Sequence, residues 1–307
     1  MSARLRAIAR ETEEIVEAGR YRGPGGRSVS IEAELTAALE HTTLYGPEPV
    51  PVTPDTDRTT RFEVTGESSL AAAHRLTRAG TDPVAVLNFA SARNPGGGYL
   101  NGAQAQEEAV CRGSALYTTL LRVPEYYEHH RTAKDAFYTD RVILSPGVPV
   151  IRDDRDRLLD APYTVGFLTS PAPNAGVIRR TAPEQAGRIP AVLASRAERV
   201  LETAVAGGYR RLVLGAWGCG VFMNSPADVA GTFRALLTGD GRFAGHFDQV
   251  VFAILDRGRD RTTVAAFRDV FAAETAGTAE TAGTAETAGT AETAGIAETA
   301  ETTDAPA

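Results

Sequence analysis

The stretch PVAVLNFASARNPGGGYLNGAQAQEEAVCRGSALYTTL, from Pro83 to Leu120, predicts a strand, a glycine-rich turn and a helix in succession. The apolar run from Val84 to Phe89 is typical of a strand that is covered on both faces of a sheet. Three consecutive glycines, Gly96 to Gly98, follow it. Because glycine loses the most backbone freedom on folding, such a run indicates positive φ angles or a ligand that lies against bare backbone.

A helical pattern of apolar residues begins directly after Gln106-Glu107-Glu108. Acidic residues in a first helical turn are favoured by the helix dipole, so the two glutamates also have a purely structural explanation. The spacing of seven residues between the glycine triplet and Gln106-Glu107-Glu108 is more specific, because it sets a carboxylate opposite a backbone cradle over one bound group. Neighbouring helical residues point about 100° apart, so Glu107 and Glu108 are not a proton-sharing pair.

A second glycine-rich segment, Gly215 to Phe222, lies between a predicted strand and a predicted helix. Small residues in this position let backbone N–H groups approach an anion, and the dipole of the next helix favours negative charge. An ordinary turn is the alternative explanation. Phe222 has two explanations, contact with a ribose or base and core packing, whereas Trp217 and Cys219 are assigned to packing and loop geometry.

Predicted strands alternate with predicted helices along most of the chain. The strands are 28–31, 61–65, 84–89, 142–144, 148–151, 163–169, 211–215 and 249–255. The helices are 5–19, 33–40, 68–79, 106–121, 189–204, 227–237 and 262–271. This alternation predicts an α/β protein, a three-layer α/β/α sandwich around a mainly parallel sheet. Ligands of such sheets lie at the carboxyl ends of the strands, where both glycine-rich segments are placed.

Three segments are expected along the chain. Residues 1–56 are predicted to form an N-terminal helical extension packed on the main fold, and the prolines between 47 and 54 mark its end. Residues 57–273 are predicted to be the main domain. Residues 274–307 repeat ETAGTA three times and ETAGIA once and contain few large apolar residues, which predicts a disordered acidic tail.

Composition and charge narrow the functional classes. The chain has 307 residues, 43% of them hydrophobic and 23% charged, as in ordinary globular proteins, and it has neither a membrane-length apolar run nor a signal core. A cytoplasmic protein is therefore expected. Although the net charge is −7, the tail holds seven acids and no base, which leaves 32 acids and 32 bases in the rest. This balance predicts no direct affinity for nucleic acid or membranes.

Other polar residues carry less information. Cys111 and Cys219 are far apart and form no CxxC motif, so neither a disulfide nor a zinc site is expected. His129-His130 has no third ligand nearby and is predicted to lie in a surface loop. The segment Arg152–Asp160 is predicted to be a solvated charged turn.

The glycine triplet, its spacer and Gln106-Glu107-Glu108 resemble the poly(ADP-ribose) glycohydrolases, in particular their compact bacterial-type branch. The segment LVLGAWGCGVFMN, from Leu212 to Asn224, adds a second resemblance in the right order. The similarity extends from about Leu5 to Phe271. It implies a macrodomain fold and hydrolysis of the ribose–ribose O-glycosidic bonds of poly(ADP-ribose), with release of ADP-ribose and without a cofactor or metal.

The resemblance also implies roles for individual residues. Glu108 would be the general acid/base, Glu107 would bind ribose hydroxyls, and Gln106 would orient the substrate. The substrate-binding backbone would be that of Gly96, Gly97 and Gly98, and the diphosphate-binding loop would comprise Gly218, Cys219, Gly220, Val221 and Phe222. Asn88 and Asn94 flank the strand end and could bind a ribose hydroxyl, although asparagine before proline is also an ordinary turn residue.

Two alternatives stay open at this point. The chain could be a macrodomain that binds ADP-ribose without turnover, or a hydrolase of mono-ADP-ribosylated protein. The intact Gln-Glu-Glu favours an enzyme, because a pure binder needs no carboxylate over the bond. Expected partners are poly(ADP-ribose), ADP-ribose and ADP-ribosylated proteins.

Overall fold

The structure is a computed structural model in which residues 2–276 are described. The predicted acidic tail therefore lies outside the described residues, except for its first three positions. Within those three, Glu274 forms an ion pair with Arg234, with 2.7 Å between the guanidinium and the carboxylate.

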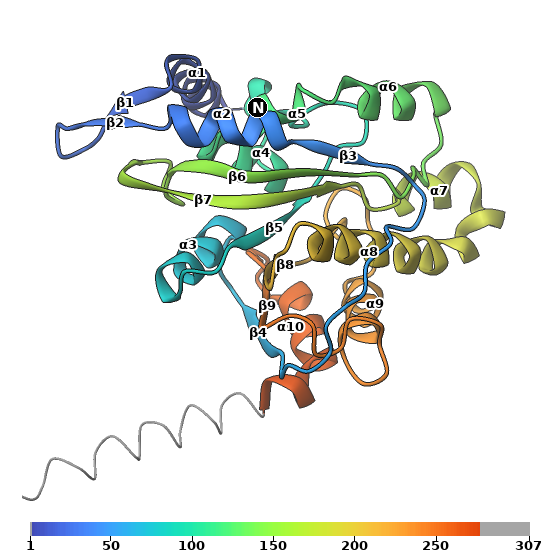
Figure 1. The fold of residues 1–307 in the computed structure, drawn as a ribbon. Helices are drawn as coiled ribbons and strands as arrows, with labels where there is room; N and C mark the ends of the chain where they lie inside the picture. The colour runs from blue at the N-terminus through green and yellow to red at the C-terminus, as the bar shows by residue number, and fades with distance from the viewer. Residues whose placement is uncertain (1, 277–307) are drawn as a thin grey trace, which may run out of the picture.

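A seven-stranded sheet forms the centre of the molecule, in the order β3-β6-β7-β5-β8-β9-β4 (Figure 1). The strands are β3 (Thr43–Tyr45), β4 (Arg61–Thr65), β5 (Val84–Phe89), β6 (Val142–Arg152), β7 (Leu158–Ser170), β8 (Arg211–Leu214) and β9 (Gln249–Ala253). The five strands from β7 to β4 run parallel, whereas β3, β6 and β7 pair antiparallel. The predicted α/β class with a mainly parallel sheet is confirmed.

Helices cover both faces of the sheet, which gives the three layers (Figure 1). One face carries α1 (Ala3–Ala18), α2 (Glu32–His41), α3 (Ser69–Ala79), α4 (Gln106–Gly113), α5 (Leu116–Leu120) and α6 (Pro124–Ala133). The other face carries α7 (Ala175–Thr181), α8 (Ile189–Ala206), α9 (Pro226–Leu237) and α10 (Thr262–Val270). The 3₁₀ helices are η1 (Tyr99–Asn101) and η2 (Pro183–Arg188), and β1 (Arg20–Arg22) pairs with β2 (Ser28–Ser30) in a separate ribbon.

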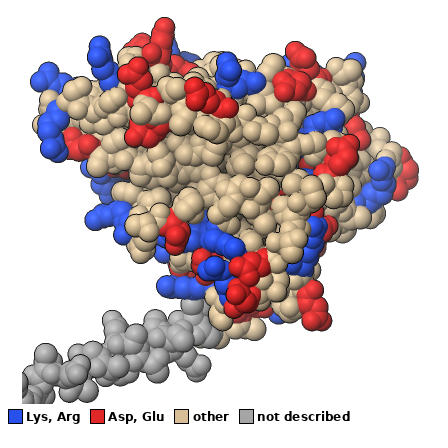
Figure 2. All heavy atoms as spheres, in the orientation of Figure 1, with Lys and Arg blue, Asp and Glu red and all other residues tan. Residues whose placement is uncertain are grey.

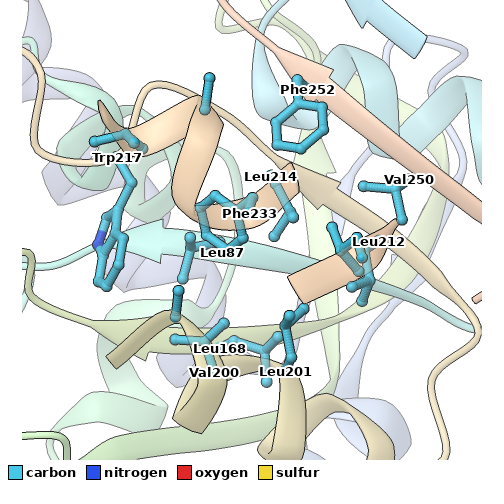
Figure 3. Packing of buried hydrophobic residues seen from close by; sticks show 14 of the residues in the cluster. Leu87, Leu168, Val200, Leu201, Leu212, Leu214, Trp217, Phe233, Val250 and Phe252 are labelled. Atoms are coloured by element: carbon cyan, nitrogen blue, oxygen red, sulfur yellow. The ribbon is translucent and has the colours of Figure 1, made fainter. Parts of the chain in front are cut away.

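The central strand β5 shows why the sheet is buried on both sides. Its side chains alternate between the faces, so Val84 and Val86 join one core cluster while Leu87 joins the other. In the cluster that contains Leu87, strand residues such as Leu214 pack against Phe233 of α9 (Figure 3). A strand that is covered by helices on both faces is expected to have a continuous run of apolar residues, and the sequence of β5 has one.

The first 56 residues contribute an edge strand to the main sheet as well as helices. Strand β3 pairs with β6 along the register from Thr43–Leu144 to Tyr45–Val142. Strands β3 and β1 are not expected from the sequence, because each is only three residues long. The division between an extension and a main domain at residue 57 stays a prediction.

Two predictions about polar segments are wrong. His129-His130 lies in α6 and not in a surface loop; His130 is buried, its ring stacks edge-on against Tyr126, and burial lowers its pKa to about 4. The segment from Arg152 to Asp160 is not a solvated turn throughout. Arg152 ends β6 with its side chain buried and paired with Glu11 at 2.9 Å. Long strands extend into this segment from both sides and leave only 153–157 as the turn.

The two strands predicted at 142–144 and 148–151 are one strand, β6, with a shift of register between Ser145 and Val148. A bulge of this kind accommodates Pro146-Gly147 without ending the strand. Among residues 2–276, no helix is long and apolar enough to cross a membrane.

Candidate active site

Three loops leave the sheet side by side at the carboxyl ends of β5, β7 and β8. The carbonyl oxygen of Ser170, the last residue of β7, accepts hydrogen bonds from two of the loops. The Ala90 N–H donates to it at 3.3 Å and the Trp217 indole N–H at 2.9 Å. The start of the loop that leads to the glycine triplet and the second glycine-rich segment, far apart in the sequence, therefore share one hydrogen-bond acceptor at the carboxyl end of β7.

Helix α4 is held against the sheet by the side chain of Gln106. Its amide oxygen accepts from the Phe89 N–H at 2.9 Å, and its amide nitrogen donates to the Leu87 carbonyl at 2.9 Å and to Ser69 Oγ at 3.1 Å. These bonds fix the start of α4 to β5 and α3. Gln106 thus positions the helix that carries the glutamates, and both ends of its amide are engaged by protein groups.

The Glu107 carboxylate is buried, with its side chain beneath the loop that follows β5. The Ser91 N–H donates to Oε2 at 2.7 Å, and Asn88 Nδ2 donates to Oε1 at 3.3 Å. Burial raises the pKa of Glu107 to about 8; the charge of Glu108 acts in the same direction, while the bonds from Ser91 and Asn88 lower it. Asn88 is itself fully buried and also donates to Thr169 Oγ1 at 3.2 Å.

Glu108 is also buried, but only one of its carboxylate oxygens is used by the protein. The Gly98 N–H donates to Oε1 at 2.8 Å. Within the described part of the chain, Oε2 has no hydrogen-bond partner. A buried polar atom without a partner is costly unless a ligand or water supplies one. Glu108 Oε2 is therefore a free acceptor in this site, as is Asn88 Oδ1, which also has no partner among the described residues.

The glycine triplet lies directly against these two carboxylates. Gly96 and Gly97 have φ angles of 64° and 59°, which confirms the prediction of positive φ. A Cβ atom on Gly97 would lie 2.6 Å from Glu108 Oε1 and 3.0 Å from Glu107 Oε2. Only bare backbone fits there, because the carboxylates already occupy the space. The triplet is thus packed against the protein's own acids.

The loop from Gly215 to Asn224 has a different arrangement of amides. The N–H groups of Trp217, Cys219, Met223 and Asn224 donate to carbonyls of the loop itself. The described residues offer no hydrogen-bond partner to the N–H groups of Gly218, Gly220, Val221 and Phe222. Asn224 closes the loop, because its Nδ2 donates to the carbonyls of Gly218 at 3.1 Å and Pro173 at 2.9 Å. Four unpaired amides in one short loop form a site suited to an anion.

Comparison with known proteins identifies the family. A family model described as "Microbial-type PARG, catalytic domain" matches residues 9–153. The structure of poly(ADP-ribose) glycohydrolase from Thermomonospora curvata is 50% identical, covers 88% of this chain and 100% of that chain, and has a TM-score of 0.83. The chain belongs to the microbial-type poly(ADP-ribose) glycohydrolases.

Two further structures agree with this assignment. The Thermomonospora curvata enzyme bound to the inhibitor ADP-HPD is 52% identical, with 87% of this chain and 99% of that chain covered and a TM-score of 0.81. The Deinococcus radiodurans enzyme in complex with ADP-ribose is 45% identical, with 77% of this chain and 96% of that chain covered and a TM-score of 0.71. These matches confirm the predicted fold of macrodomain type. The comparison with curated proteins found no match.

In this poly(ADP-ribose) glycohydrolase, several residues that the sequence analysis missed support the site. Tyr99, directly after the triplet, is buried, and its hydroxyl donates to Glu13 at 2.9 Å and to the Ala9 carbonyl at 3.1 Å. The Ser2 N–H donates to the Gly102 carbonyl at 3.1 Å. Helix α1 thus anchors the chain between the triplet and α4, and no motif signals these contacts between distant segments.

At the rim of the site, Phe222 is half-buried and faces Tyr138, with 5.9 Å between the ring centroids. Tyr138 has a φ of 60°, which is uncommon for a non-glycine residue. Asn94 is exposed, and its carbonyl accepts from the Gly97 N–H at 2.9 Å. Trp217 is buried and packs against Phe233, as predicted. Among the described residues, no cluster of three or more His, Cys, Asp or Glu is placed to hold a metal.

Proposed function

We propose that this glycohydrolase acts in the cytoplasm on the ribose–ribose O-glycosidic bonds of poly(ADP-ribose), with the scissile bond next to Glu108 and ADP-ribose as the product. Membership of the family supports the reaction. The observation that carries the assignment to Glu108 is its buried Oε2 atom, which has no partner among the described residues and is a free site for a substrate hydroxyl or a ribose oxygen.

In the proposed mechanism one carboxyl group serves both half-reactions. Protonated Glu108 donates its proton to the departing ribose oxygen as the C1″–O bond breaks, which leaves an oxocarbenium-like ribosyl centre. The Glu108 carboxylate then takes a proton from water as the water oxygen attacks that centre. Most glycosidases instead use two carboxyl groups that flank the bond. Glu107 would bind ribose hydroxyls, and the buried Asn88 would act through its bond to Glu107.

The loop from Gly218 to Phe222, which includes Cys219, is proposed to bind the diphosphate. Its four unpaired N–H groups can donate to phosphate oxygens, and α9 begins shortly after with its dipole favouring negative charge. The bound diphosphate would also stabilise the nearby oxocarbenium-like cation. Phe222 would lie against a ribose or base, and the exposed Asn94 could reach a ribose hydroxyl. Binding of ADP-ribose by a relative supports this placement.

The backbone of Gly96, Gly97 and Gly98 would complete the substrate-binding surface on the side of the glutamates. ADP-ribosylated proteins are proposed as further partners, since they carry the same polymer. Binding without turnover and hydrolysis of mono-ADP-ribosylated protein are the competing activities, and the products distinguish them.

The test is release of ADP-ribose from labelled poly(ADP-ribose), measured for the wild type and for Glu108→Gln. Because general acid–base assistance is typically worth ~10²–10⁴-fold, we expect the turnover rate of the variant to fall by about that factor while it still binds ADP-ribose in calorimetry. Glu128→Gln, on the exposed face of α6, is the matched control and should keep the wild-type rate. A wild-type rate for Glu108→Gln would exclude it as the acid/base, and a wild type that releases no ADP-ribose would refute the activity.

A further inference from the structure

A groove of about 650 Å³ lies between α3 and the turn that joins β6 to β7. None of the residues proposed for catalysis or substrate binding lines it. Five of its lining side chains are arginines, namely Arg75, Arg78, Arg152, Arg155 and Arg157. They stand against two lining aspartates, Asp153 and Asp154, so the lining has an excess of three positive charges. This local excess contrasts with the balanced charge of the chain outside the acidic tail.

Three of these arginines already have acidic partners. Arg75 pairs with Glu63 and Glu67 at 3.0 and 2.7 Å, Arg157 pairs with Asp153 at 2.6 Å, and Arg152 pairs with Glu11 at 2.9 Å. The side chains of Arg78 and Arg155 have no hydrogen bond or ion pair within residues 2–276. Both are exposed, one on each wall of the groove. Two free guanidinium groups therefore face a shared space.

An aromatic pair lines the same groove. The rings of His74 and Tyr163 stack with 4.7 Å between centroids and an angle of 14°. The Tyr163 hydroxyl donates to the Leu70 carbonyl at 2.9 Å, which fixes the ring against α3. Cationic groups beside flat rings are the combination that binds chains of phosphates and bases, since the cations contact phosphates and the rings contact bases.

Hydrogen bonds connect the groove to the catalytic helix through α3. Ser69, in the first turn of α3, accepts the hydrogen bond from Gln106, and Ser68 donates to Asp154 in the β6–β7 turn. Figure 2 shows Lys and Arg side chains gathered around the position of α3. A polymer whose end is bound at the glutamates would have a second, cationic surface on the same domain.

We propose that this groove binds poly(ADP-ribose) units beyond the one at the catalytic glutamates, with Arg78 and Arg155 contacting their diphosphates and the His74–Tyr163 pair contacting an adenine. The proposal rests on the function proposed above. Poly(ADP-ribose) is favoured over nucleic acid as the occupant because the same domain is built to cleave that polymer. Holding the chain at a second point raises its effective concentration at the active site without any new contact there.

The test is the double variant Arg78→Glu/Arg155→Glu, assayed on long poly(ADP-ribose) and on a dimer of ADP-ribose. We expect KM for the long polymer to rise about tenfold with kcat unchanged, and the dimer to be cleaved as by the wild type. The slope of log affinity against log salt should become shallower by about 1.4, because each of the two phosphate contacts on a flexible strand contributes about 0.7. Arg27→Glu/Arg268→Glu changes the net charge equally on other surfaces and is the matched control.

Several outcomes would overturn the proposal. They are an unchanged KM for the long polymer, an equal rise in the control, an equal effect on the dimer, and competition by single-stranded RNA as strong as that by the polymer. Arg78→Gln/Arg155→Gln removes the charges without reversing them and should give a smaller effect of the same kind. If the double glutamate variant fails to fold, the double glutamine variant tests whether the groove binds the polymer. A wild type that releases no ADP-ribose refutes the proposed function, whereas an unchanged KM in an active enzyme refutes only the groove.

Discussion

The two glycine-rich loops leave the same edge of the sheet, but their glycines meet different neighbours. At Gly97 a Cβ atom would collide with the carboxylates of Glu107 and Glu108, so the space beside the backbone is already filled by protein. At Gly220 a Cβ atom would have nothing within 4 Å. The triplet is therefore built around the acids, whereas the second loop leaves open the space beside Gly220 but not that beside Gly218, where a Cβ atom would collide with the Ala172 side chain.

The hydrogen bonds of the two loops differ in the same way. In the triplet, the Gly97 and Gly98 N–H groups donate to the Asn94 carbonyl and to Glu108. In the second loop, four N–H groups have no partner among the described residues, namely those of Gly218, Gly220, Val221 and Phe222. A glycine-rich sequence thus has two meanings, close packing of the protein on itself and exposure of amides to a ligand. Substitutions at matched positions separate them.

The largest effect is expected for Gly97→Val. A side chain at a φ of 59° costs ~1–3 kcal/mol of strain, and here it also pushes against both carboxylates. Because a displacement of about 1 Å in a catalytic group can cost ~10²-fold, we expect at least that loss of turnover together with a lower melting temperature. Turnover on labelled polymer and thermal unfolding of the same preparation measure the two effects.

Gly26→Ala and Gly97→Ala form the matched pair for this prediction. Gly26 also has a positive φ, of 78°, but a Cβ atom there would meet nothing within 4 Å. Gly26→Ala should therefore show the backbone strain alone and keep full turnover, whereas Gly97→Ala should lose turnover as well. Full activity of a folded Gly97→Ala would show that the carboxylates move aside freely, and the first half of the comparison would be wrong.

A smaller effect is expected from Glu107, the buried acid of α4 that lies against the triplet. The pKa of Glu107 is raised from 4.5 to about 8, so the folded chain holds this proton more tightly than the unfolded chain. The stabilisation is complete below pH 4.5 and is lost as the pH rises towards 8. Glu107→Gln has no titratable carboxyl group at this position. Its free energy of unfolding should therefore fall less than that of the wild type over this pH range, with a difference on the order of a few kcal/mol.

Denaturant unfolding at the two ends of this pH range measures the prediction. The difference in unfolding free energy between Glu107→Gln and the wild type should change in favour of the variant as the pH rises. Glu14→Gln, on the exposed surface of α1, is the control and should follow the wild type. A difference that stays constant with pH would show that Glu107 is ionised throughout, held by the N–H groups of Ser91 and Asn88.

How much of this arrangement is predictable depends on whether the cause is local. The strand at Val84–Phe89, the positive φ of the triplet and the helix start at Gln106 follow from residue preferences along a short segment. Residue preferences do not predict which oxygen of Glu108 is left without a partner, because that depends on which oxygen accepts the hydrogen bond from the Gly98 N–H.

Contacts between distant segments account for the parts of the fold that sequence reasoning missed. The segment YYEHH is predicted to be a surface loop, yet α6 buries His130 beside Tyr126 and Thr139. Likewise, the support of Tyr99 by α1 joins positions 86 and 90 residues apart. No pattern within either segment indicates the other, so these features required the structure.

The last prediction concerns the open loop and is the counterpart of Gly97→Val. Gly220→Val adds a side chain where the described protein leaves room and where φ is not positive, so the fold should keep its wild-type melting temperature. If the N–H groups of Gly220 and Val221 hold a diphosphate, the new side chain should obstruct at least one charged hydrogen bond, worth about 1.5–3 kcal/mol, and weaken ADP-ribose binding by about tenfold or more. Calorimetric titration of ADP-ribose measures this, with Gly187→Val as the control, since a Cβ atom on Gly187 also meets nothing within 4 Å. Unchanged affinity would remove Gly220 from the diphosphate site. A fall in melting temperature with unchanged affinity would instead make this loop a structural turn, and the contrast with the triplet would then disappear.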